Sequence, residues 1–153
     1  MPIEGVGAAQ AGLDALISRI NEGARKGAQD AGFVVEASAK RHASGRPGPE
    51  VRTGTMRRSI TTSPVVETGP GRWSVEVAPH VIYGRIQELG GTITAKNRMV
   101  GSGGPYLIFQ INGAWRMKSS VTLPARPYMH PAAIESRPAA LAAVVARLRE
   151  TVG

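Results

Sequence analysis

The clearest pattern of apolar and polar positions lies near the start of the chain. Apolar and small side chains recur there at intervals of three and four residues, beginning with Leu13, Leu16, Ile17 and Ile20. Charged side chains fill much of the opposite face, which is typical of an amphipathic helix. The pattern predicts one long helix over residues 12–41.

Two uses of this helix stay open. Gly23, Gly27 and Gly32 each weaken it by up to about 1 kcal/mol relative to alanine, but a stripe of glycine and alanine lets another helix approach closely. The apolar face either covers the sheet of its own domain or forms a subunit interface. Ile17 is the candidate interface residue on it.

The middle of the chain is rich in extended segments. Prolines and glycines after the first helix predict a loop and a short turn over residues 42–58, followed by a β region over 59–123. Alternation of apolar and polar side chains at Trp73–Val77 is typical of a half-buried strand.

The strongest local signal is a β-hairpin over residues 106–117. Its turn is Asn112-Gly113, a pair that readily adopts the positive φ angles of a type I′ turn. We expect Lys118–Leu123 to prolong the second strand. Before the hairpin, the glycine-rich segment 96–104 predicts a loop that is mobile in a free subunit and ordered by a partner.

Helical spacing of apolar residues returns over residues 131–152. Pro138 interrupts this helix region, so we expect Ser136 to cap a helix that runs from Arg137 to about Thr151.

These elements predict a single α+β domain over residues 1–153. Its centre is a mainly antiparallel sheet or small sandwich, with the long N-terminal helix packed on it and a C-terminal helix. The chain holds 19 glycines and 11 prolines, so much of it is turns or arms. We expect a thin core that partner subunits complete.

Charge and composition narrow the classes of function. The net charge of +8 favours polyanions, but the cations are spread along the chain, so a diffuse basic surface and a DNA site both stay open. The chain has no cysteine, and its three histidines are scattered, so we expect no metal and no cofactor. Nothing resembles a signal peptide or a membrane span, and we expect synthesis in the cytoplasm.

Catalytic patterns are missing from the sequence. No phosphate-binding glycine loop, nucleophile elbow or helical His-Glu pair of the zinc hydrolase type occurs. We therefore expect a protein that is not an enzyme. The competing class is a basic nucleic-acid-binding module, which would bind duplex with strong salt dependence.

Three segments form a pattern of another kind. They are Thr53–Ile60, Tyr83–Ile93 and Pro124–Ala132, and the last two flank the hairpin. Together they resemble a tail-component family of long-tailed phages, with Thr-Gly-x-Leu-Arg-x-Ser-Ile, Tyr before Glu-hydrophobe-Gly-Gly, and Arg-Pro-aromatic-hydrophobe-x-Pro-Ala in that order. Glu88–Gly91 and Leu123–Tyr128 are also similar to Mu-type virion-morphogenesis proteins.

The resemblance implies a virion protein of the neck or tail-completion ring at the head-to-tail joint. The implied partners are further copies of the chain in a ring, six-fold by analogy, and neighbouring neck and tail-tube proteins, with non-specific contact to packaged DNA. A tail terminator or a head-closure ring are the alternatives.

The same segments also have purely structural explanations: Gly90-Gly91 as a turn, Arg126-Pro127 as the end of a strand, and Pro131 as a helix start. Besides Ile17, the candidate interface residues are Arg57, Arg58, Glu88, Lys96, Arg98, Arg126 and Tyr128. Arg126 and Glu88 are the best polar candidates, because such pairs can fix the register between subunits.

Overall fold

The computed structural model describes residues 6–96 and 105–153. The helices in these ranges are α1 (Val6–His42), α2 (Thr55–Ser59), α3 (Gly84–Leu89) and α4 (Met129–Val152). The strands are β1 (Ile60–Thr62), β2 (Val66–Gly69), β3 (Arg72–Ser74), β4 (Val77–Pro79), β5 (Gly91–Thr94), β6 (Leu107–Ile111), β7 (Ala114–Lys118) and β8 (Ser120–Leu123). The predicted loop 96–104 lies outside the described residues, apart from Lys96.

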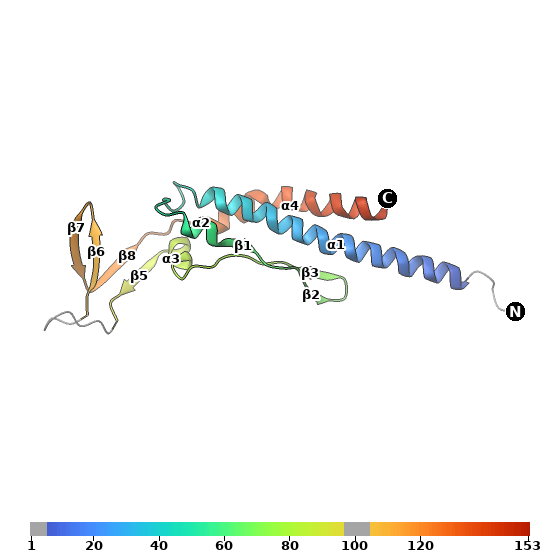
Figure 1. Cartoon of the computed structure of the whole chain (residues 1–153), viewed down its shortest axis with the longest axis horizontal. Helices are drawn as coiled ribbons and strands as arrows, with labels where there is room; N and C mark the ends of the chain where they lie inside the picture. Colours follow the sequence, from blue (N-terminus) through green and yellow to red (C-terminus); the bar gives the residue numbers. More distant parts are fainter. Residues whose placement is uncertain (1–5, 97–104) are drawn as a thin grey trace.

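The molecule is elongated, with α1 and α4 side by side along it and the β6–β7 hairpin at the end away from the N-terminus (Figure 1). The two long helices run antiparallel and approach closely at glycines of α1. A Cβ atom on Gly27 would lie 3.0 Å from the Cα atom of Val144, and one on Gly23 would meet the side chain of Thr151. The predicted close packing at these glycines is confirmed.

The helix bounds differ from the predicted ones. α1 begins at Val6, six residues before the predicted start, and Pro138 lies inside α4. Ser136 does not cap this helix; its buried hydroxyl donates to the carbonyl oxygen of Ala132 at 2.6 Å. The burial of Ala132 and Ser136 holds the preceding turns, so the missing N–H of exposed Pro138 does not end the helix.

The α+β class is confirmed, but the strands pair two by two instead of forming one sheet or a sandwich within the described residues. The antiparallel pairs are β1 with β4, β2 with β3, β5 with β8, and β6 with β7. Asn112 and Gly113 have φ angles of 50° and 80° between the paired residues Ile111 and Ala114, which confirms the predicted hairpin. The predicted continuation of its second strand is wrong, because β8 leaves β7 and pairs with β5.

The core is small, as the composition predicts. It lies where the end of α1 meets α2, β1 and the start of α4, and its largest fully buried side chains are Tyr128 and Ile60. The other buried apolar residues are Ala39, Ala43, Met56 and Ala132. α1 therefore packs mainly on α4 and only partly on strands, not on a broad sheet as predicted. In the part of the chain that the structure describes, no helix has the length and apolar character of a membrane span.

Candidate interface surfaces

The three segments that resemble the tail-component family come together in space. Tyr128, at the start of α4, is fully buried beside α3, and its hydroxyl donates to the carbonyl oxygen of Gly84 at 3.3 Å. Burial raises the pKa of Tyr128 to about 12, with the charge of Glu88 as a second cause. Ile60 from the first segment shares the same core. We call this junction of α2, α3 and the start of α4 the hub.

Glu88 joins α3 to the first turn of α4. Its carboxylate accepts hydrogen bonds from the backbone N–H groups of Tyr128, Met129 and His130, at 2.7, 2.9 and 2.9 Å. The first N–H groups of a helix have no partner within the helix, and a negative charge there is favourable. Glu88 therefore caps a helix that lies 40 residues further along the chain.

The Gly90-Gly91 turn has a steric reason. Gly90 has a φ of 69°, and a Cβ atom there would lie 2.7 Å from the backbone nitrogen of Ala125. Gly91 has a φ of 145°. Positive φ angles favour glycine, so the structural explanation of this pair as a turn is confirmed.

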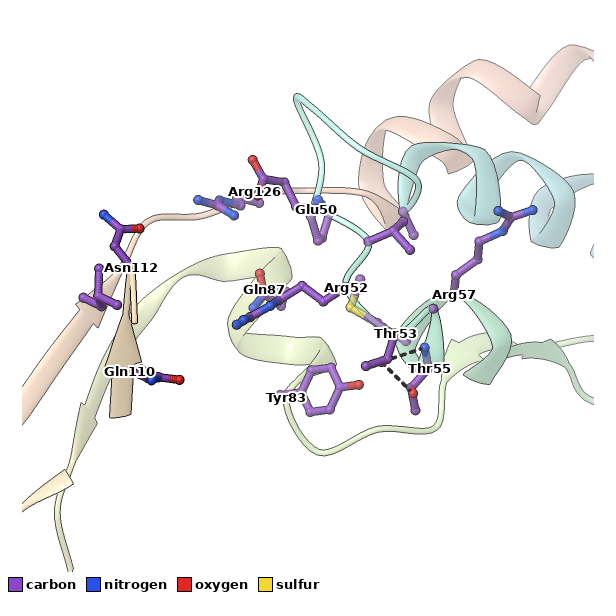
Figure 2. A pocket seen from close by; sticks show the side chains of 16 residues that line it. Glu50, Arg52, Thr53, Thr55, Arg57, Tyr83, Gln87, Gln110, Asn112 and Arg126 are labelled. Carbon is purple, nitrogen blue, oxygen red and sulfur yellow. Dashed lines mark hydrogen bonds between the residues drawn. The ribbon is translucent and has the colours of Figure 1, made fainter. Parts of the chain in front are cut away.

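A hollow of about 780 Å³ opens beside the hub. Three segments of the chain surround it: the loop before α2, the helix α3, and the end of the β6–β7 hairpin (Figure 2). Arg52 extends into it toward Gln87, while Arg126 lies at its edge. A second hollow adjoins it through Arg52 and Arg57, and Lys40 and Arg58 also line that one.

The two hollows carry a surplus of positive charge. Among the described residues, Arg52, Arg57, Arg58 and Arg126 form no ion pair, whereas Lys40 pairs with Glu36 at 2.6 Å. Hydroxyl and amide groups, such as those of Thr53, Gln87 and Asn112, also line the larger hollow, together with apolar side chains such as Val51 and Met56. We call the larger hollow the arginine hollow.

The first part of α1 is exposed to solvent. Residues 6–20 are all exposed, because the helix packing with α4 begins at Gly23, where Thr151 lies. The side chain of Arg19 still reaches the last turn of α4 and donates to the carbonyl oxygen of Thr151 at 2.7 Å. Figure 1 shows α1 continuing past the C-terminus toward the N-terminus without a neighbour. This part of α1, the free segment Val6–Ile20, exposes Leu13, Ile17 and Ile20 at 60%, 55% and 40%.

The β5–β8 and β6–β7 pairs form an arm that projects from the hub (Figure 1). Every residue from 111 to 120 is exposed. Trp115 and Met117 on β7 are 71% and 51% exposed, and Ile108 on β6 is 46% exposed.

A comparison with known protein families identifies the family of the chain. A model of the bacteriophage HK97-gp10 tail-component family matches residues 8–90, more than half of the 153-residue chain. The chain belongs to this family of phage tail components. It is a structural protein of the virion and not an enzyme. The matched region runs from α1 to the Glu88–Gly90 end of α3. No curated protein and no solved structure matches the chain.

The predicted interface residues of this tail component fall into separate places. Ile17 lies on the free segment, and Arg57 and Arg126 line the arginine hollow. Arg58 lines the second hollow, and Lys96 is exposed after β5. Arg98 lies outside the described residues.

Glu88 and Tyr128 have roles within the chain, as the helix cap and the centre of the core. An interface role for these two residues stays a prediction. Glu88 and Arg126 form no ion pair within the described residues; the backbone N–H of Arg126 instead donates to the carbonyl oxygen of Gln87 at 2.7 Å.

Sequence reasoning missed two features. Arg52 was not a candidate, although it lines both hollows. The last helix was not a candidate interface either, yet Ile134, Leu141 and Val145 of α4 are 60%, 63% and 38% exposed. The sequence signal for this surface is that apolar residues of the last helix fall on two of its faces, and a helix packed on one neighbour needs only one.

Proposed function

We propose that this tail component is a ring subunit of the head-to-tail joint, in the neck or tail-completion ring. The observation that supports this best is the free segment of α1. It exposes three large aliphatic side chains, Leu13, Ile17 and Ile20, by 40% or more. Large contiguous apolar patches on a soluble protein mark interaction sites, because leaving them in water costs roughly 25 cal/mol per Å².

The thin core supports an assembly role. The hydrophobic core holds only six buried residues of the described chain, so a single copy has little core of its own to stabilise the long α1 and the arm. Packing against further copies would bury apolar surface that the single chain leaves in water. The six-fold number rests on analogy alone.

The arm and the arginine hollow are the surfaces for other virion proteins. Trp115 and Met117 offer the large, exposed apolar contacts that are enriched in protein interfaces. The hollow offers arginine side chains, whose planar donor groups bind carboxylates with two parallel hydrogen bonds. Neck and tail-tube proteins with acidic surfaces would fit this second site.

Electron microscopy of a lysate from a phage with a nonsense mutation in this gene tests the role. We expect filled heads and separate tails of normal length, because DNA packaging and tube polymerisation do not need the last ring of the joint. Tails of uncontrolled length would instead assign the chain to the tail terminator, and filled heads that lose their DNA to a head-closure ring. Normal, infectious virions would contradict a structural role at the joint.

A basic nucleic-acid-binding module is the second candidate, and the arginine hollow favours it. Arg52, Arg57 and Arg126 without ion-pair partners in the described chain could each neutralise a phosphate. Binding of duplex DNA by the free protein should then fall steeply between about 50 and 200 mM salt. Absence of binding at low salt would reject this candidate.

A further inference from the structure

α4 carries two different faces. One face packs on α1 through Val144 and Thr151, and Arg147 adds an ion pair with Asp30. Another row of apolar side chains on α4 is exposed. It consists of Ile134, Leu141, Val145 and Val152, which are exposed by 60%, 63%, 38% and 46%.

The side chains of this row lie in line along the axis of α4. Its members are seven, four and seven residues apart, so at 3.6 residues per turn each direction lies within about 20° of their mean. The half-buried Leu148 lies at its edge. We call this row the outer stripe of α4. It needs a partner that presents a matching straight apolar row.

The free segment of α1 presents such a row. Val6, Leu13, Ile17 and Ile20 are spaced by seven, four and three residues, and Ile134, Leu141, Val145 and Leu148 repeat the same spacing. This is the a/d spacing with which helices interlock side by side. The free segment is about 22 Å long and the outer stripe about 28 Å, at 1.5 Å per residue, so the stripe can accept the whole segment.

The two rows of one chain cannot meet each other. The free segment continues beyond the end of α4 (Figure 1), and the covered part of the same helix packs on Val144 and Thr151 of α4 and not on the outer stripe. A second copy can supply each partner. We propose that the free segment of one subunit packs on the outer stripe of the next subunit. This inference rests on the proposed ring and specifies the contact between its subunits.

Charge favours this pairing over like with like. Asp14 flanks the row on α1, whereas Arg137 and Arg149 flank the outer stripe, and none of them has an ion-pair partner in the described chain. Pairing two outer stripes would bring the arginines together, and pairing two free segments would oppose the two Asp14 carboxylates. A contact between two different surfaces also propagates from subunit to subunit, and closes into a ring when the rotation allows it.

The absence of cysteine from the natural chain makes a cross-linking test clean. Variants Ile17→Cys, Leu141→Cys and Val145→Cys place single thiols at the centres of the two rows. Differently tagged pairs are co-expressed, purified and oxidised, and their products are separated without reductant. We expect a dimer of twice the 16.1 kDa chain from Ile17→Cys with Leu141→Cys if the helices run antiparallel, or with Val145→Cys if they run parallel.

Matched controls come from the other faces of the same helices. The pair Ser18→Cys with Ala146→Cys should give no dimer, and each single variant alone should give at most a trace. Dimers from Ile17→Cys alone or from Leu141→Cys alone would overturn the proposal in favour of like-with-like contact. An oligomer by light scattering without any mixed cross-link would overturn it and leave the ring intact, whereas a monomer throughout would overturn the ring as well.

Discussion

The two parts of α1 differ in their surroundings and in the residues at which they make contacts. From Gly23 onward the helix is covered by α4 and by strands, and its buried residues there are glycines, Ser38 and Ala39. Every residue of the free segment is exposed, yet Leu13, Ile17 and Ile20 are found there. Three large aliphatic side chains thus lie on the part of α1 that the single chain leaves exposed.

The difference separates two kinds of packing. Within the chain, small residues let backbones approach closely, as Gly27 does against Val144. Between copies, we propose that long aliphatic side chains interlock instead. Substitutions at the covered end should therefore change stability, and substitutions at the free end should change assembly.

The largest effect is expected at Tyr128. Tyr128→Ala empties the centre of a small core and should lower the free energy of unfolding by about 3–5 kcal/mol, as for other large aromatic residues. Urea unfolding followed by circular dichroism measures this. Tyr83→Ala, at a residue that is 41% exposed, is the control and should change stability by no more than about 0.5 kcal/mol. Equal losses in both variants would contradict the position of the core.

A smaller loss is expected at the helix cap. Glu88→Gln removes the negative charge that faces three backbone N–H groups of α4, and should cost about 1–2 kcal/mol. Glu67→Gln, on exposed β2, is the matched control. Hydrogen exchange at the first turn of α4 should accelerate in Glu88→Gln only. Unchanged exchange there would show that the carboxylate does not hold this turn.

The next effect depends on pH. Glu36 of α1 accepts hydrogen bonds from Lys40 and from Thr62 of β1, and these bonds, with Lys40 first, lower its pKa below the ordinary 4.5. A lowered pKa in the folded state means that stability is present above 4.5 and is lost as the pH falls through the lowered value. Glu36→Gln should therefore flatten the decline of the urea midpoint in acid. A decline as steep as that of the natural chain would contradict this role.

Local signals in the sequence predicted the elements that depend on near neighbours. Asn112-Gly113 alone specifies its turn, and the spacing from Leu13 to Ile20 alone specifies a helical face. The role of Glu88 depends on N–H groups 40 residues away, and the exposure of Ile17 depends on where α4 ends. Neither can be read from a local pattern, because each is set by tertiary contacts.

The continuation of α4 through Pro138 is also set by tertiary contacts. A proline removes one helical hydrogen bond, and the sequence shows only this loss. The burial of Ala132 and Ser136 against the core, which holds the preceding turns, comes from distant segments.

The central claim is that the free segment of α1 serves assembly and not the fold of one chain. Light scattering on eluting fractions, with circular dichroism, tests it on the natural chain, on Ile17→Asp and on Ser18→Asp as the control on the polar face. We predict an oligomer for the natural chain and the control, and a folded 16.1 kDa monomer with unchanged helix content by circular dichroism for Ile17→Asp. An Ile17→Asp variant of full oligomeric mass, or one that unfolds, would contradict the claim.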